Sequence, residues 1–379
     1  MQRRYDIDLL RNLGILLLFP FHAARIFDVW DPFYVKNVAP SQGLSWLVAL
    51  IAFWFMPLLF WLAGSASWYA LRRRTDRQYV GERFSRLFVP FVAGTLIVVP
   101  PQGYIATRMP GGEPGGYLEY LARFFADFSD LSGYTGAFTP AHLWFILYLF
   151  VFSLIGLPMF RALIRQLDDD DAPVRRAMGF LSRPQVFVLL FVPLTAVQAL
   201  PAPGGQNPFY YFFIYAAGFL ACAHPDFEGM LAKCRFPALL ALAVTVPVWV
   251  WMLDHFGNLS GFSPAAILFT LLRTLNVWLT LIAITGYGLK LRHVRPSWLR
   301  YANEAAFPVY IVHQTVIVVI GWFIVQQDWN LYVKFAVILI SSFAASCLLY
   351  EAAIRRLAPL RLLFGVKSAP PPRAKMKGT

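Results

Sequence analysis

Residues 8–25 read DLLRNLGILLLFPFHAAR, an apolar stretch that is long enough to cross a lipid bilayer yet carries charged side chains. Similar stretches recur along the chain, each near the ~20 residues that a membrane-spanning helix needs. We place them at 9–28, 44–70, 86–105, 141–163, 185–202, 208–223, 236–253, 263–289, 304–325 and 332–354. The sequence therefore predicts an all-α, polytopic integral membrane protein with about ten transmembrane helices and no separate soluble domain. The short 208–223 stretch is the weakest of these spans.

The composition also favours a membrane protein over a soluble one. The chain has 379 residues, of which 58% are hydrophobic and only 14% are charged, whereas soluble domains carry roughly 25% charged residues. Its net charge of +13 does not indicate a nucleic-acid partner, because the basic residues lie in short clusters between apolar stretches. The three cysteines lack metal-binding spacing, so we expect neither disulfides nor a metal site.

Lys and Arg residues gather in alternate connectors between the spans. The basic connectors are 71–86, 164–184 and 290–303. The connectors without Lys or Arg are 203–207, 254–262 and 326–331. Because basic connectors stay in the cytoplasm, an even number of spans places both termini there.

The chain divides into a transmembrane domain, residues 1–366, and a basic cytoplasmic tail, residues 367–379, that we expect to be disordered. Within the domain, an external loop spans 106–140. Apolar residues recur there at helical spacing, namely Tyr117, Leu118, Leu121, Phe124, Phe125 and Phe128. This pattern predicts an amphipathic helix that lies on the outer membrane surface or over a cavity.

The first span carries the densest set of polar residues. Arg11 and His22 are eleven residues apart, which on a helix is three turns plus about 20°, so both project from one face about 16 Å apart. Asp8 and Arg25 extend this face by a turn at either end. Charged residues in lipid cost at least about 2.5–3.5 kcal/mol each and usually serve function. We therefore expect a functional site along this face.

His22 is the candidate catalytic residue, with Arg11 as its companion. A neutral histidine takes a proton from a hydroxyl and later returns it, or it accepts an acyl group itself. The alternative is a histidine that only makes hydrogen bonds between helices.

Arg83 and Arg86 lie one helical turn apart at the cytoplasmic end of the third span. Guanidinium groups bind phosphates in a bidentate way, so both suit a phosphate-bearing donor such as coenzyme A. The alternative is that they serve only the membrane orientation. Other residues at membrane depth are candidates for a substrate cavity, and we expect His313 to be able to face His22. These candidates are Arg25, His142, Trp144, Arg273, Tyr310 and His313.

These residues together resemble the membrane-bound acyltransferase family 3. The family's hallmark, an Arg or Lys, ten residues and then a His in the first span, is similar to Arg11 through His22. Its Arg-x-x-Arg is similar to Arg83 and Arg86. Further matching stretches are Phe53…Gly64, His142-Leu-Trp-Phe145, Tyr310-Ile-Val-His313 and Leu349-Tyr-Glu351…Arg361-Leu-Leu-Phe-Gly365. The resemblance runs from near residue 5 to near residue 365 and is strongest to members that add succinyl groups to periplasmic glucans.

The resemblance implies a ten-helix acyltransferase, of the class that transfers groups other than aminoacyl groups, in the bacterial cytoplasmic (inner) membrane. It would move an acetyl or succinyl group from cytoplasmic acyl-CoA, a co-substrate rather than a bound cofactor, to a hydroxyl of an extracytoplasmic glycan. His22 would act as base or acyl carrier, and Arg11 would orient or charge-balance the site. Arg83 and Arg86 would hold the donor phosphates.

Two other classes of function stay open on the residues alone. A proton-coupled transporter or a lipid or glycan flippase could use an Arg–His stripe, although we find no internal repeat. A haem protein could use His22 and His313 as axial ligands. Each class predicts a different observation. An acyltransferase gives an ester product, a transporter or flippase gives transport without an ester product, and a haem protein is coloured when purified.

Overall fold

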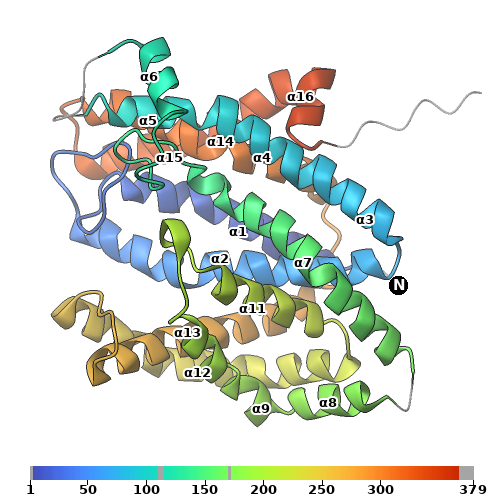
Figure 1. Ribbon diagram of the computed structural model, residues 1–379. Coiled ribbons are helices and arrows are strands. Elements are labelled where there is room, and N and C mark those ends of the chain that lie inside the picture. The colour runs from blue at the N-terminus through green and yellow to red at the C-terminus, as the bar shows by residue number, and fades with distance from the viewer. Residues whose placement is uncertain (1–2, 110–114, 170–171, 367–379) are drawn as a thin grey trace, which may run out of the picture.

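The computed structural model describes residues 3–109, 115–169 and 172–366, and all the regular structure in these ranges is helical (Figure 1). The predicted tail at 367–379 lies outside the described residues. The long helices are α1 (Tyr5–Arg25), α2 (Gln42–Leu71), α7 (Trp144–Leu167), α12 (Pro225–Phe256), α13 (Pro264–Gly288), α14 (Leu299–Val325) and α15 (Leu331–Leu349). Each of them covers one of the predicted apolar stretches.

The remaining stretches form shorter or interrupted helices. Residues 76–106 make a continuous run of α3 (Asp76–Arg83), η1 (Phe84–Phe88), α4 (Val89–Ala93), η2 (Gly94–Val98) and α5 (Pro100–Ala106), in which η1 and η2 are π-helical. The others are α6 (Tyr117–Phe124), η3 (Ala141–Leu143), α8 (Pro173–Leu181), α9 (Pro184–Leu189), α10 (Phe191–Val197), η4 (Pro203–Gly205), α11 (Pro208–Leu220), η5 (Leu289–Leu291), η6 (Tyr350–Ile354) and α16 (Ala358–Leu363). We call the end of the bundle that carries the N-terminus the basic end, and the end that carries α6 the opposite end (Figure 1).

Within the described residues, eight helical runs are long and apolar enough to cross a membrane, or nine if the α8 and α9–α10 pair, bent by 81°, counts as one. The prediction of an all-α, multi-pass membrane protein is confirmed, although the number of spans is lower than about ten by this criterion. The difference lies in α11, because its 13 residues rise only about 20 Å against ~30 Å of hydrocarbon.

The contacts of α11 nevertheless show which way it runs. Phe60 of α2 packs on Tyr211 of α11, and eight residues further along both helices Trp68 meets Phe219. The two helices are therefore parallel. Parallel helices need an odd number of passes between them, which α3–α5, α7 and α9–α10 provide together. The broken α9–α10 run thus completes a pass, as the alternation of basic connectors predicts.

The predicted amphipathic helix is shorter than the pattern suggested. It ends at Phe124 as α6, because the chain turns after it and Asp127 accepts a hydrogen bond from the Ser129 backbone N–H at 2.9 Å. Tyr120 and Phe124 are buried, whereas Leu118 is 80% exposed. The buried face of α6 is therefore aromatic, and its Tyr120 lines a cavity.

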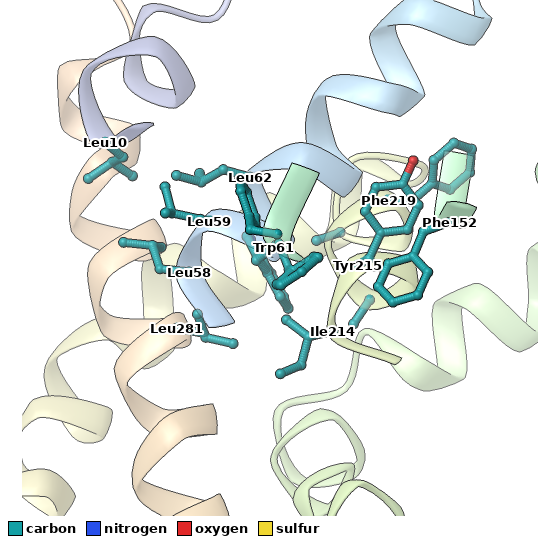
Figure 2. Packing of buried hydrophobic residues seen from close by; sticks show 14 of the residues in the cluster. Leu10, Leu58, Leu59, Trp61, Leu62, Phe152, Ile214, Tyr215, Phe219 and Leu281 are labelled. Carbon is teal, nitrogen blue, oxygen red and sulfur yellow. The ribbon is translucent and has the colours of Figure 1, made fainter. Parts of the chain in front are cut away.

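α2 lies at the centre of the largest buried cluster. Its Leu58 and Leu59 face Leu10 of α1 and Leu281 of α13, while aromatic rings of α7 and α11 lie on the other side of Trp61 (Figure 2). The first span is thus held against the protein core along its length, which leaves its polar face directed at neighbouring helices rather than at lipid.

Glycines allow the backbones of α2 and α11 to touch. A Cβ atom on Gly64 would lie 1.9 Å from the carbonyl oxygen of Tyr215, and one on Gly218 would lie 2.1 Å from that of Trp61. Small residues at such crossings are a common device of membrane helix packing. The close contact fixes α11 against α2 although α11 is short.

Replacing Gly64 with alanine is expected to lower the free energy of unfolding by about 3 kcal/mol, because the obstructing atoms belong to the backbone of α11 and cannot rotate away. The measurement is the midpoint of thermal unfolding in detergent. Gly81→Ala is the matched control, since nothing lies within 4 Å of a Cβ there and alanine is the better helix former. Equal midpoints for the two variants would contradict the packing described.

Candidate active site

Arg11 and His22 lie on the uninterrupted helix α1, which continues through Pro20. Arg11 Nη2 donates hydrogen bonds to Asp8 Oδ1 at 3.0 Å and to Asn303 Oδ1 at 2.8 Å. Asn303 belongs to α14 and was not singled out from the sequence, where an Asn at the start of an apolar run is a weak signal. Its Nδ2 is buried without a hydrogen-bond partner among the described residues. The arginine is thus positioned from two helices.

A cavity of about 400 Å³ opens beside Arg11 at the basic end. Arginines dominate its walls, together with Asp8 and Tyr69. They are Arg3, Arg4, Arg11, Arg73 and Arg74. Because guanidinium groups outnumber carboxylates there, the cavity suits an anionic ligand such as a phosphate.

Arg83 and Arg86 do not form a matched pair. The helix widens into the π-helical turn η1 directly after Arg83. Arg83 turns inward, where Nη2 donates to Ser67 Oγ at 3.3 Å and the guanidinium lies 4.6 Å from the Tyr79 ring. Arg86 is exposed and within electrostatic range of Arg11. Neither lines the 400 Å³ cavity, so their donor-binding role stays a prediction.

Three histidines from different helical segments meet in the bundle. The His313 ring of α14 is the central one, with its centroid 5.1 Å from that of His22 and 5.0 Å from that of His142 in η3. His313 and His142 are buried, whereas His22 is half-buried. Tyr310 packs against both buried rings at 5.7 Å. The structure thus brings four of the predicted residues together, including the expected His22–His313 pair.

Backbone carbonyls fix the hydrogen positions on two of these rings. His142 Nε2 lies 2.9 Å from the Ile311 oxygen, and His313 Nδ1 contacts the Tyr310 oxygen. Since a carbonyl only accepts, each contacting nitrogen carries the hydrogen, and the other nitrogen of the ring keeps its lone pair. Those lone pairs, on His142 Nδ1 and His313 Nε2, have no partner among the described residues, nor does His22 Nδ1. Such unpartnered buried atoms are rare and suit proton or group transfer.

Arg25 organises the loop that follows α1. It donates to Asp28 Oδ2 at 2.7 Å, and Lys36 Nζ lies 2.7 Å from the other oxygen of the same carboxylate. The loop carries Phe33, whose ring is stacked on His22 at 6.1 Å and contacts the Arg25 guanidinium at 5.8 Å. Sequence reasoning did not single out Asp28 or Phe33, although the three-residue spacing of Arg25 and Asp28 could have indicated the ion pair.

Replacing Asp28 with asparagine is expected to destabilise the fold by about 3–5 kcal/mol, because its fully buried carboxylate balances both Arg25 and Lys36. The matched control is Asp31→Asn, which removes a carboxylate that also pairs with Arg25 but is 65% exposed. The control should change stability by less than about 1 kcal/mol. Thermal unfolding of both variants measures the difference, and an equal loss in the two would contradict it.

Two predicted cavity residues have other partners. Trp144 packs on Phe60 and Tyr211, at ring distances of 5.9 and 5.1 Å. Arg273 Nη2 donates to Gln198 Oε1 at 3.0 Å in the contact between α13 and the segment after α10. Trp144 therefore anchors α7 against α2 and α11, and Arg273 has an uncharged protein partner.

The ring geometry also bears on the metal and haem alternatives. In residues 3–109, 115–169 and 172–366, no group of three or more His, Cys, Asp or Glu side chains is arranged to hold a metal ion. The His22 and His313 rings are tilted by 51° and lie 5.1 Å apart. They are close to direct contact, so a flat macrocycle does not fit between them, and the geometry disfavours the haem hypothesis.

A bundle of apolar helices surrounds three imidazoles, each with one nitrogen that has no partner among the described residues, and a cavity rich in arginine lies at the basic end. These features define a multi-pass membrane protein with a centre suited to moving a proton or an acyl group. A family model described as an acyltransferase domain matches residues 4–351. The chain belongs to this family, acyltransferase family 3, and is an acyltransferase. Membership favours acyl transfer over the transporter and flippase hypotheses.

Similar proteins extend over the full chain at low identity. Glucans biosynthesis protein C of Salmonella typhimurium is 22% identical over 395 residues, covering 100% of this chain and 98% of the relative. The proteins of the same name from Salmonella schwarzengrund and Salmonella typhi are each 21% identical over 383 residues, covering 96% of this chain and 95% of the relative. No solved structure shows a significant match.

Proposed function

We propose that this acyltransferase moves an acetyl or succinyl group from cytoplasmic acyl-CoA to a hydroxyl of an extracytoplasmic glycan, with His22 as base or acyl carrier. The name of its relatives, Glucans biosynthesis protein C, supports a glucan acceptor. The observation that carries the proposal is the buried Nδ1 of His22, which, like Nε2 of the adjacent His313, has no partner in the described part of the chain. The same helix carries Arg11 in the wall of the arginine-rich cavity.

The proposed reaction conserves every proton. The acceptor hydroxyl attacks the thioester carbonyl, so that a C–O bond forms and the C–S bond breaks. His22 takes the hydroxyl proton and returns it to the departing thiolate, which leaves an ester and free coenzyme A. If His22 carries the acyl group instead, its nitrogen attacks the thioester, the C–S bond breaks, and the thiolate leaves with the proton of the ring N–H. The acceptor hydroxyl then attacks the acyl group, the C–N bond breaks, and the hydroxyl proton returns to the ring. His313 would hydrogen-bond the acceptor hydroxyl.

The donor would enter from the basic end. Its phosphates would bind the 400 Å³ cavity, where Arg11 is held by Asp8 and Asn303, with Arg83 and Arg86 on the neighbouring run. The distance along α1 from Arg11 to His22 is about 16 Å, which an extended pantetheine arm of coenzyme A spans. Acyl-CoA is thus a co-substrate in this proposal, and the chain needs no bound cofactor.

The proposal includes an orientation. The basic end would lie in the cytoplasm of a bacterial cell, by the positive-inside rule, with both termini there and the protein in the inner membrane. Arg11 contacts Asn303 and, about ten residues further along each helix, His22 contacts His313. α1 and α14 are therefore parallel, as they must be if they are the first and ninth passes. No nucleic acid takes part, and the lipid bilayer is the remaining partner.

Mass spectrometry of cell-envelope glycans tests the function. Cells with the protein should contain glycans heavier by one acyl group, and cells without it should lack that mass. The mass difference identifies the acyl group, and fragmentation of the modified glycan identifies the acceptor. Identical glycan spectra from the two strains, with the protein present in the membrane, would overturn the proposal.

A further inference from the structure

A second cavity, of about 740 Å³, lies at the opposite end of the bundle. The loop after α1, the end of α5, α6 and the segment after α6 form its walls. Four aromatic side chains line it, namely Phe33, Tyr34, Tyr120 and Tyr134. The volume falls in the range of ~300–1,000 Å³ that small-molecule sites usually have. The cavity is therefore large enough for a ligand of more than one sugar ring.

Aromatic contacts connect this cavity to the histidine cluster. Phe33 is stacked on His22 with an interplanar angle of 21°. The same ring lies 6.2 Å from that of Tyr134, which in turn lies 5.1 Å from that of Tyr34. A ligand against the Tyr134 ring is thus separated from His22 by one side chain, and rotation of Phe33 would bring the two into contact.

One polar atom in the cavity wall lacks a partner. Tyr120 is only 2% exposed, and its hydroxyl makes no hydrogen bond to any described residue. It lies against Gly103 of α5, where a Cβ atom would clash with the oxygen. A buried hydroxyl without a partner costs free energy of folding. A ligand that accepts or donates a hydrogen bond at this position would remove that cost.

The charged groups of the wall are already engaged by the protein. Lys36 Nζ donates to Asp28 and to the backbone oxygen atoms of Arg25 and Asp31. Asp127 accepts a hydrogen bond from the Ser129 backbone N–H and interacts electrostatically with Arg123, the third charged residue of the wall. The cavity therefore offers aromatic faces and hydroxyl groups rather than an unbalanced charge, which suits a neutral ligand with many hydroxyl groups better than a phosphate or a cation.

We propose that this cavity binds sugar rings of the acceptor glycan, an assignment that rests on the function proposed above. The apolar C–H face of a pyranose ring would pack on Tyr134, the partly exposed ring of the wall, and the Tyr120 hydroxyl would hydrogen-bond a sugar hydroxyl. Phe33 would separate the bound sugar from His22 until its ring rotates and a sugar hydroxyl reaches the His22 imidazole. The acceptor would thus reach the histidines from the opposite end to the donor.

Binding measured without the donor tests the assignment. The full-length protein in lipid nanodiscs is titrated by calorimetry with laminariheptaose and maltoheptaose, which are β- and α-linked glucose oligomers. We expect at least one of them to bind. Tyr134→Ala should then weaken binding more than about tenfold. Tyr120→Phe keeps the ring and should weaken it about three- to tenfold, the value of one neutral hydrogen bond, with an unchanged or higher unfolding temperature.

The matched control is Phe128→Ala, which removes an aromatic ring that is 60% exposed and outside the cavity wall. It should leave the dissociation constant within twofold of the wild-type value. The assignment is overturned if neither oligosaccharide binds, or if both cavity variants bind as tightly as Phe128→Ala. Binding that depends on Tyr134 and Tyr120 while envelope glycans stay unacylated would instead overturn the proposed function and leave the sugar site standing.

Discussion

Replacing His22 with alanine is expected to reduce acyl transfer by about 1,000-fold or more, since general acid–base catalysis alone contributes roughly 10²–10⁴-fold. The acyl-dependent mass shift of envelope glycans should disappear. The fold should persist, because the Nδ1 atom of this ring has no hydrogen-bond partner among the residues that the structure describes. The measurements are the turnover rate of the purified variant, its unfolding temperature and its level in the membrane.

The control for this substitution is His255→Ala. His255 is exposed near the end of α12, where its Nδ1 hydrogen-bonds the Trp251 carbonyl oxygen and lies 3.9 Å from Asp254 of the same helix, so its loss should leave turnover unchanged. Wild-type turnover in the His22 variant would mean that another group takes the hydroxyl proton. His313 would then be the next residue to replace, because its ring is the nearest imidazole to His22.

Local sequence patterns predict which residues share a helix, whereas tertiary packing decides which other residues they contact. Arg11 and His22 share a face of α1 because spacing along one helix determines direction. The contact of Arg11 with Asn303 depends on how segments far apart in the chain pack, and the contact of His22 with Phe33 depends on how the loop after α1 folds back on the helix. No local pattern encodes those contacts, which is why the two partners were missed.

The same reasoning explains the split between Arg83 and Arg86. Two arginines one turn apart indicate a matched pair only if the helix is regular. Here a π-helical turn follows Arg83, and hydroxyl groups from other helices, including Ser67, draw its guanidinium inward. Packing also accounts for the short α11, since Gly64 and Gly218 press it against α2. A helix that is covered by protein rather than lipid can be shorter than the bilayer.

Replacing Arg11 with glutamine is expected to lower kcat/KM for acyl-CoA by about 100-fold or more. Removing one partner of a hydrogen-bonded charge contact usually costs roughly 2–5 kcal/mol, and here the loss would also leave Asp8, which still pairs with Arg3, in the cavity that we propose binds the donor phosphates. If Arg11 binds the donor, the effect appears in KM for acyl-CoA. If it orients the site near His22, the effect appears in kcat. Steady-state kinetics over a range of acyl-CoA concentrations separates the two.

Two further variants sharpen this prediction. Arg11→Lys keeps the charge but loses the forked geometry of the guanidinium. If charge matters most, its kcat/KM should lie well above that of Arg11→Gln. If the contacts to Asp8 and Asn303 matter most, the two variants should have similar kcat/KM. Arg356→Gln is the matched control, because Arg356 is exposed, lies outside the cavity, and its guanidinium donates to the Glu351 carbonyl oxygen rather than to a carboxylate. Equal kinetics for Arg11→Gln and Arg356→Gln would show that the Arg11 guanidinium serves membrane orientation alone.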